Sequence, residues 1–204
     1  MRLIGMLDSP YVRRVAVSLK VLGVPFELDQ LSVFRNFEQF SAINPVVKAP
    51  TLVTDDGVVL MESSLILEYL ERIAPRRLMP ADARAVRQVG LALAACEKSV
   101  SIVYELNTRP AEKQHLPWLD RVVGQLHHAY AALEAEIPDS WFTGEELMQP
   151  QITTAVAWRF TRHTSPDRLD AAKFPKLAAL SARAEATPAF RETNFTEAVF
   201  GPGK

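Results

Sequence analysis

The sequence predicts an α/β domain followed by an all-α domain. The 204 residues are 48% hydrophobic and 23% charged, which is typical of a folded globular protein long enough for two small domains. The first 75 residues mix the periodicities of strands and helices, whereas only helical spacing follows a proline- and arginine-rich segment. We therefore expect domains at residues 1–75 and 81–204, joined by a linker at 76–80.

The first domain opens with a strand, a helix and a second strand. Residues 2–6 have the pattern of a short buried strand, and Ser9-Pro10 is a preferred pair for the N-cap and first position of a helix. Apolar side chains then recur on one helical face until Gly23 ends the helix, and residues 26–31 return to a strand pattern. Two strands joined in this way within one sheet are parallel, with a right-handed crossover.

A hairpin and a third helix complete this domain. Residues 51–54 and 58–61 are β-rich runs on either side of Asp55-Asp-Gly57, which is a strong hairpin signal. Helical spacing returns from Ser63 onward. Strand–helix–strand followed by strand–strand–helix is the order of a thioredoxin-like fold.

The rest of the chain predicts a helical bundle. A long helix carries an apolar stripe made of Val86, Val89, Leu93, Cys96, Val100 and Val103. A second helix starts near Pro117, and its stripe is made of Leu119, Val122, Leu126, Leu133 and Ile137. Pro150 and Pro175 mark the starts of further helices. Because Cys96 lies within the first stripe, we expect it to be a core residue and not a nucleophile.

Charge and composition exclude several classes of function. The net charge of -1 leaves no basic surplus for binding nucleic acid or an anionic membrane. A single cysteine rules out an internal disulfide and suits a reducing compartment, and no segment resembles a signal peptide or a membrane span. His127 and His128 are adjacent and face different sides of their helix, so we expect no metal site. These observations favour a cytoplasmic protein with neither nucleic-acid nor membrane partners.

Three short motifs of the first domain are notable for their order and spacing. They are Asp8-Ser-Pro-Tyr-Val-Arg-Arg14, Asn44-Pro-Val-Val-Lys-Ala-Pro50 and Glu62-Ser63-Ser64. In this they resemble the cytosolic glutathione S-transferases. The predicted pair of domains is also similar to that family's fold, so the resemblance spans the whole chain. Ser-Pro-aromatic at the first helix most resembles the serine-type branches, Tau and its bacterial relatives. The resemblance implies an enzyme that conjugates glutathione to a small hydrophobic electrophile, as a homodimer and with no metal.

The resemblance also implies which residues bind glutathione. Lys48 would meet the glycyl carboxylate, Ala49 would pair with the cysteinyl peptide before a cis Pro50, and Glu62 and Ser63 would hold the γ-glutamyl end. Glutathione carries two carboxylates, an ammonium group, two peptide groups and a thiol, so its binder needs cationic, anionic and backbone partners. The start of a helix, where Glu62 and Ser63 lie, favours an anion.

Ser9 is the catalytic candidate. A thiol with a pKa near 8.5 is only a few per cent thiolate at pH 7, so a hydroxyl that donates to sulfur raises the concentration of the nucleophile. The alternative is that Ser9 serves only as an N-cap; the two roles are compatible because a capping oxygen keeps its own proton. Tyr11 is a rival hydroxyl, although its place inside the helix favours packing on the sheet. A serine cannot form a mixed disulfide, which disfavours thiol-exchange chemistry.

The second substrate and the remaining polar residues are less well defined by sequence. In Tau-like relatives an aromatic residue late in the first long helix of the second domain lines the electrophile pocket, and Tyr104 matches that place; the alternative is that it ends the core stripe. Thr108 stands where relatives carry an arginine. Arg13 and Arg14 could steer the acidic peptide, but we interpret them as a solvated helix face outside the site. Residues 148–151 replace the family's capping box, and we expect a weaker cap there.

Two other functions remain as alternatives. Some transcription and translation factors, of the stringent-starvation and elongation-factor kind, resemble this family and use the fold for protein interaction. Such a module should have lost the residues that bind the peptide, whereas all of them are present here. Glutathione-dependent peroxidase activity needs the same thiolate and therefore stays open.

Overall fold

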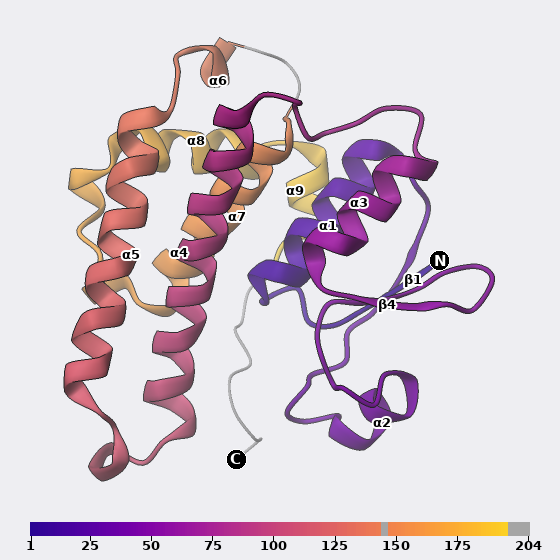
Figure 1. Ribbon diagram of the computed structural model, residues 1–204, viewed down its shortest axis with the longest axis horizontal. Helices are drawn as coiled ribbons and strands as arrows, with labels where there is room; N and C mark the ends of the chain where they lie inside the picture. Colours follow the sequence, from indigo (N-terminus) through magenta and orange to yellow (C-terminus); the bar gives the residue numbers. More distant parts are fainter. Residues whose placement is uncertain (144–146, 196–204) are drawn as a thin grey trace. The chain divides into compact units, whose positions relative to one another are not determined.

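A computed structural model describes residues 1–143 and 147–195 of the chain. Contacts divide it into two compact units: residues 1–78 together with the segment from 188 onward, and residues 79–187 (Figure 1). The division differs from the expected domains at the end of the chain, where the segment from 188 groups with the first unit. The limits of 1–75, 76–80 and 81–204 stay predictions.

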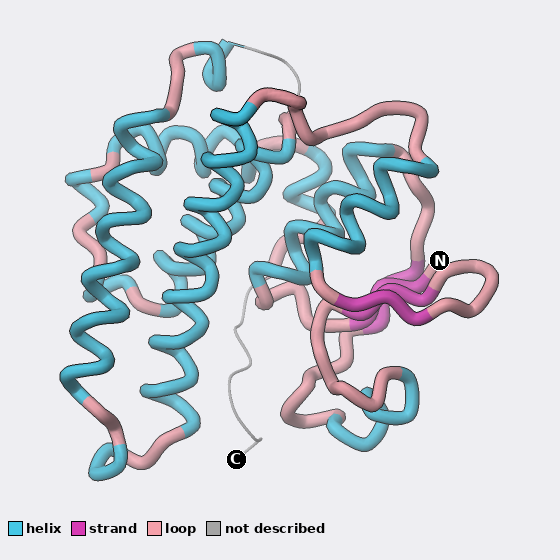
Figure 2. The backbone as a smooth tube through the Cα atoms, in the orientation of Figure 1, coloured by secondary structure: helices cyan, strands magenta, loops and turns pink. Residues whose placement is uncertain are grey.

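The first unit is a four-stranded mixed sheet with helices on both faces. Its elements are β1 (Arg2–Ile4), α1 (Pro10–Leu22), β2 (Glu27–Asp29), α2 (Phe37–Ile43), β3 (Thr51–Val53), β4 (Val59–Met61), α3 (Ser63–Ile73) and α9 (Pro188–Glu192). The strand order is β2-β1-β3-β4, with β1 and β2 parallel and the other pairs antiparallel. Helices α1 and α3 cover one face and α2 lies on the other (Figure 2). The predicted thioredoxin-like order is confirmed, whereas α2 and α9 are helices that the sequence analysis does not predict.

The local signals at the ends of these elements are also confirmed. Ser9 is the N-cap of α1, and Gly23 ends that helix in the left-handed conformation with a φ of 69°. In the hairpin, the amide of Gly57 donates to the carbonyl of Thr54 at 3.0 Å, and β3 and β4 pair on either side of this turn. Short sequence patterns therefore place both ends of α1 and the β3–β4 hairpin correctly.

The strand register brings three segments to one end of the sheet. Ile4 of β1 pairs with Thr51 of β3, which in turn pairs with Met61 of β4. Strands β1 and β4 end at this row, whereas β3 begins there. The residues just beyond the row are Gly5, Pro50 and Glu62. The turn into α1, the loop before β3 and the start of α3 consequently lie at the same end of the sheet.

Gly5 allows these segments to approach closely. Its φ is +139°, and a Cβ at this position would lie 2.6 Å from Cγ2 of Val12 and 3.1 Å from Cβ of Ala49. Real Cβ atoms do not come this close to a buried neighbour, so position 5 needs glycine. The first turn of α1 and the loop that contains Ala49 both pack directly on it.

Helix α1 has no solvated face at its centre. Arg13 and Arg14 are each only 1% exposed, so their interpretation as a solvated helix face is wrong. The physical reason is that α1 packs against β1, α3 and also α9, the helix that sequence periodicity does not reveal.

Arg13 anchors α9 to α1. Its Nε donates to the carbonyl of Thr193 at 3.0 Å and its Nη2 to the carbonyl of Phe190 at 3.3 Å. The guanidinium group also lies 5.2 Å from the ring centroids of Phe190 and Phe195. A cation is favoured at carbonyls that end a helix and over aromatic faces. These contacts explain why the segment from residue 188 belongs to the first unit.

The second unit is helical, as predicted. Its helices are α4 (Ala83–Thr108), α5 (Leu116–Glu136), α6 (Ser140–Thr143), α7 (Gln149–Thr164) and α8 (Pro175–Glu185), with short 3-10 turns at Ala111–Lys113, Pro166–Arg168 and Ala171–Lys173. Helix α4 packs against α5, beside it in Figure 1, and against α7. The stripe predicted for α5 is buried along its whole length, and Cys96 is confirmed as a buried core residue. None of the helices in the described part of the chain has the length and apolar character needed to cross a membrane.

The buried face of α4 is wider than its predicted stripe and shifted along the sequence. Val86 is 53% exposed, whereas its neighbour Ala85 is buried. The buried face also includes polar residues, because α4 packs between two other helices. Gln88, for example, donates from Nε2 to the carbonyl of Glu136 at 3.1 Å. A pattern of apolar residues alone therefore misplaces this face.

The start of α7 is better capped than expected. The amide of Met148 donates to Oε1 of Gln151 at 3.2 Å, which reproduces one half of a capping box. Gln151 therefore keeps its half of the cap, because an amide oxygen accepts the same hydrogen bond as a carboxylate oxygen.

Candidate functional site

The residues expected to bind glutathione lie on the three segments that meet at one end of the sheet. Ser9 precedes α1, residues 48–50 precede β3, and Glu62 and Ser63 begin α3. The structure thus brings together residues that are about fifty positions apart in the sequence. Tyr104 and Thr108, expected near the electrophile, belong to α4 of the second unit.

Ser9 has a hydroxyl that is only weakly engaged. Its backbone is extended, with φ -71° and ψ 124°, and Oγ accepts from the amide of Val12 at 3.4 Å. By comparison, Asp82, the N-cap of α4, accepts from Ala85 at 2.9 Å. The cap at Ser9 is long for an N–H···O bond, so it uses little of the bonding capacity of this oxygen. Ser9 is half-buried and keeps its hydroxyl hydrogen for another acceptor.

The loop before β3 is fixed from inside by Asn44. Its Nδ2 donates to Oγ1 of Thr51 at 2.8 Å, and its Oδ1 accepts from the amide of Val46 at 3.1 Å. Thr51 in turn donates to the carbonyl of Lys48 at 2.7 Å. Asn44 belongs to the second motif, but no role is predicted for it from sequence. Its buried hydrogen bonds show that it fixes the loop before β3.

The same loop leaves its candidate binding groups near the surface. The Ala49–Pro50 peptide bond is cis, as the resemblance implies. Lys48 is exposed, and Ala49 is half-buried. A fixed backbone next to an exposed ammonium group is suited to an extended peptide that ends in a carboxylate.

Glu62 has an unusual backbone and caps its own helix. Its φ is +73°, a conformation that costs a non-glycine residue about 1–3 kcal/mol and is concentrated at functional sites. Its Oε2 accepts from the amides of Ser64 and Leu65 at 3.1 and 3.4 Å. The side chain is half-buried, and a carboxylate has further lone pairs that can accept from a ligand.

Ser63 is held by an arginine that the sequence analysis placed outside the site. Nη1 of Arg14 donates to Oγ of Ser63 at 3.0 Å and to Oγ of Ser64 at 3.1 Å. Oγ of Ser63 also lies 3.5 Å from Oε1 of Glu62. A sequence signal was present: the helix around Arg14 is apolar on more than one side, with Val12, Val15 and Val17 all buried, so little of it was left to face water.

The start of α3 consequently offers groups of opposite charge within one turn. The guanidinium of Arg14 and the first amides of the helix favour an anion, whereas the carboxylate of Glu62 favours a cation. The free end of an α-amino acid carries one of each. This arrangement can therefore bind a zwitterionic amino-acid group.

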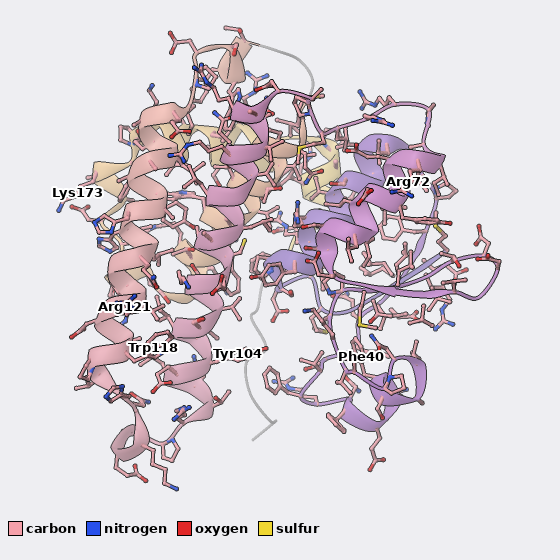
Figure 3. The ribbon with its side chains drawn as sticks, in the orientation of Figure 1. Phe40, Arg72, Tyr104, Trp118, Arg121 and Lys173 are labelled. Atoms are coloured by element: carbon pink, nitrogen blue, oxygen red, sulfur yellow. The ribbon has the colours of Figure 1, made fainter. Side chains whose placement is uncertain are left out.

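Tyr104 is a surface residue of the second unit. Its side chain is 44% exposed on α4 (Figure 3), while Val103 beside it is buried, so the alternative that Tyr104 ends the core stripe is wrong. The hydroxyl of Thr108 donates to the carbonyl of Tyr104 at 2.6 Å. Arg109 pairs with Glu105 at 3.2 Å.

The described residues contain no group of three or more His, Cys, Asp and Glu side chains that could hold a metal ion. His127, one of the two adjacent histidines, hydrogen-bonds through Nε2 to the carbonyl of Arg168 at 2.6 Å.

Comparisons with known proteins find related sequences and structures. The family model for the glutathione S-transferase N-terminal domain matches residues 3–78. A glutathione S-transferase structure from Methylobacterium radiotolerans, in complex with glutathione sulfonate, is 30% identical with a TM-score of 0.84, covering 98% of this chain and 99% of that one.

Two further relatives extend the comparison. A glutathione transferase family member from Pseudomonas fluorescens, with bound S-(propanoic acid)-glutathione, is 31% identical with a TM-score of 0.79, covering 95% of this chain and 98% of that one. The GST-like protein YibF of Escherichia coli is 28% identical over 162 residues, which are 77% of this chain and 80% of that protein.

Proposed function

Because this chain belongs to the glutathione S-transferase family, we propose that it binds glutathione in its first unit and transfers it to a small hydrophobic electrophile. The observation that carries the proposal is the start of α3, where Arg14, Ser63 and Glu62 present opposite charges to an amino-acid group. Related structures that contain glutathione derivatives support the same ligand.

The proposed binding mode uses the three segments in turn. Ser63 and its amide take the γ-glutamyl carboxylate, and Glu62 accepts from the γ-glutamyl ammonium group. The backbone of Ala49, before Pro50, pairs with the cysteinyl peptide in the manner of an added strand. Lys48 meets the glycyl carboxylate, which its exposed side chain supports. The peptide then runs along the end of the sheet with its thiol towards the start of α1.

Ser9 stabilises the thiolate in this proposal. The thiol loses its proton to solvent, and the hydroxyl of Ser9 donates to the resulting sulfur anion, helped by the N-terminus of α1. The sulfur then forms a bond to the electrophilic carbon, and the electron pair moves to the leaving group or to the adjacent unsaturated group. The geometry at Ser9 is compatible with this role, because its oxygen only accepts from the helix and its hydroxyl hydrogen can be donated to sulfur. Tyr11 stays the rival hydroxyl.

The second substrate is assigned by resemblance. Tyr104 and Thr108 are our candidates for contact with the electrophile, and the exposed side chain of Tyr104 is compatible with that role. Hydrophobic contacts discriminate poorly between small apolar compounds, so the chemical class of the electrophile has to be found by assay.

Calorimetry with glutathione, followed by an activity screen, tests the proposal. The screen covers aryl halides, unsaturated carbonyl compounds and hydroperoxides. We expect glutathione to bind and at least one carbon electrophile to be conjugated. If only hydroperoxides are turned over, the protein acts as a glutathione-dependent peroxidase and not as a transferase. Absence of glutathione binding would overturn the proposal and favour an interaction module.

We further propose a twofold homodimer, as the family resemblance implies. Leu116 and Trp118 at the start of α5 are 61% and 45% exposed and offer apolar surface. The sequence also places small residues on α4 that would let helices approach closely, namely Gly90, Ala92, Ala94 and Ala95. Ala92 and Ala95 belong to the core of the second unit, whereas Gly90 is exposed and Ala94 is half-buried. Light scattering should give twice the chain mass of 22.7 kDa, and a concentration-independent monomer mass would exclude the dimer. The cytoplasmic location also stays a prediction.

A further inference from the structure

Two adjacent arginines of α1 are buried to the same extent and contact different parts of the first unit. Arg13 binds backbone carbonyls of Phe190 and Thr193 at the end of the chain. Arg14 binds the hydroxyls of Ser63 and Ser64 in the first turn of α3. Since both side chains are 1% exposed, the difference between them lies in their partners and not in their burial.

The contacts of Arg14 determine how the hydroxyl of Ser63 is used. Nη1 donates to Oγ of Ser63 at 3.0 Å, so this oxygen acts as the acceptor and its own hydrogen is directed elsewhere. The alternative acceptor is Oε1 of Glu62, at a distance of 3.5 Å, which is too long for a strong hydrogen bond. A ligand carboxylate at the start of α3 would therefore be a better acceptor for this hydrogen.

The second contact fixes the guanidinium itself. The same Nη1 donates to Oγ of Ser64 at 3.1 Å, so the cation is held between the first two side chains of the helix. At this place its charge adds to the positive end of the helix dipole. The guanidinium charge and the helix dipole therefore both favour an anion that binds there.

We propose that Arg14 is a positioning residue for the γ-glutamyl carboxylate of glutathione: it orients the Ser63 hydroxyl as a donor and supplies positive charge behind it. The inference rests on the proposed function, because it concerns the same binding site. Arg14 acts on the ligand through Ser63 and need not touch it. Arg13, one residue earlier, has no such role, because its partners belong to the end of the chain.

A ligand pair tests this role separately from stability. The first ligand is glutathione, and the second is 4-aminobutyryl-cysteinyl-glycine, which keeps the ammonium group and lacks only the γ-glutamyl carboxylate. Calorimetry on the wild type should show a preference for glutathione. In Arg14→Gln that preference should fall by at least about tenfold, because a charge-supported hydrogen bond to the carboxylate is lost. Arg14→Lys, which keeps the charge, should restore part of it.

Arg13→Gln is the matched control. It removes a cation of equal burial from the same helix, so it should lower the melting temperature and leave the preference between the two ligands unchanged.

In steady-state assays Arg14→Gln should raise the KM for glutathione without moving the pH profile of kcat.

Each outcome has a defined meaning. If Arg14→Gln or Arg14→Lys weakens both ligands by the same factor, Arg14 is only a structural residue and the inference fails. If Arg14→Gln does not fold, the ligand preference of Arg14→Lys decides the question. A preference for glutathione in Arg14→Lys that equals the wild-type preference would overturn the inference. Failure of the wild type to bind glutathione at all would instead overturn the proposed function.

Discussion

The first unit buries Arg14 and Ser63 at the end of its sheet, whereas the second unit buries Ser99, Tyr130 and Thr161 in the middle of its helical core. In the second unit the hydroxyls satisfy one another. Thr161 Oγ1 lies 2.5 Å from Oγ of Ser99 and 2.6 Å from the Tyr130 hydroxyl, and it donates to the carbonyl of Ala157 at 3.0 Å. Burial also raises the pKa of Tyr130 well above its ordinary value, so this phenol stays protonated.

The comparison separates two uses of buried polar groups. The hydroxyl cluster of the second unit is closed: its bonds link α4, α5 and α7 and specify how these helices pack. The cluster of the first unit adjoins Glu62, a half-buried residue in a conformation that is costly for its type. We infer that burial alone does not distinguish structure from function. Structural and functional clusters differ in whether the hydrogen-bonded groups lead to a partly exposed carboxylate or to the start of a helix.

The largest effect is expected for Glu62, because it serves as both ligand contact and helix cap. Glu62→Ala should weaken glutathione binding by about 1.5–3 kcal/mol, since the substrate ammonium group loses its partner, and Ser63→Ala should do the same for the carboxylate. Glu62→Ala should in addition lower the free energy of unfolding by about 1 kcal/mol through loss of the cap. Calorimetry and denaturant titration measure the two effects.

Glu68→Ala is the control on the same helix. Glu68 is exposed and pairs with Arg72 one turn later, so its substitution should cost less than about 0.5 kcal/mol of stability and no affinity. Unchanged affinity in both Glu62→Ala and Ser63→Ala would show that the γ-glutamyl site is elsewhere.

The next effect concerns the chemistry at Ser9. Ser9→Ala should raise the pKa of the bound thiol and lower the rate at pH 7 by about ten- to a hundredfold, as expected for one charge-assisted hydrogen bond. Higher pH should partly rescue the rate, because solvent then removes the proton unaided. Glutathione affinity should stay nearly intact. Ultraviolet titration of the bound thiolate measures the shift directly.

Asp82→Ala is a control for the N-cap in the second unit. Its shorter hydrogen bond predicts a larger loss of stability than Ser9→Ala causes, without any change in the pH profile. An identical thiol titration in wild type and Ser9→Ala would limit Ser9 to the capping role.

The closed hydroxyl cluster should affect stability and not activity. Thr161→Val leaves the buried hydroxyls of Ser99 and Tyr130 without their shared partner and should cost about 1–3 kcal/mol of unfolding free energy. Thr154→Val, on the same helix, should be neutral or stabilising, because Oγ1 of Thr154 is buried with no partner among the described residues. Thermal melting compares the two variants. A loss of glutathione affinity in Thr161→Val would contradict the conclusion that the hydroxyl cluster of the second unit is purely structural.

The smallest effect is expected at the exposed hairpin turn of the first unit. A hydrogen bond from the Thr54 hydroxyl holds the pKa of Asp56 below its ordinary value. A carboxyl with a lowered folded-state pKa stabilises the fold above its unfolded pKa of about 3.9, and this contribution disappears as the pH falls through the lower folded value. Asp56→Asn should therefore lose a little stability at neutral pH and none in strong acid. Equal losses at both pH values would exclude this linkage.

The sequence alone determined the order of the strands and of the main helices, and it indicated which segments carry the candidate site. Its signals were local: the Ser9-Pro10 pair, the Asp-Gly turn, the apolar stripe of α5 and the three short motifs each lie within a few residues or a few helical turns. Backbone sterics, capping and helical periodicity operate over the same range, which is why these features are visible without the fold.

Only the tertiary structure decided how α1 is covered and what its arginines do. Arg14 and Ser63 are 49 positions apart, and Arg13 and Thr193 are 180 positions apart. The wider buried face of α4 likewise depends on α7, which follows much later in the chain. A side chain's environment is set by the segments that pack against it. The valines around Arg14 indicate burial, but the pattern within one helix does not identify the distant segments that supply the contacts. For this reason the sequence indicated a solvated face where the fold builds a buried contact to the candidate binding site.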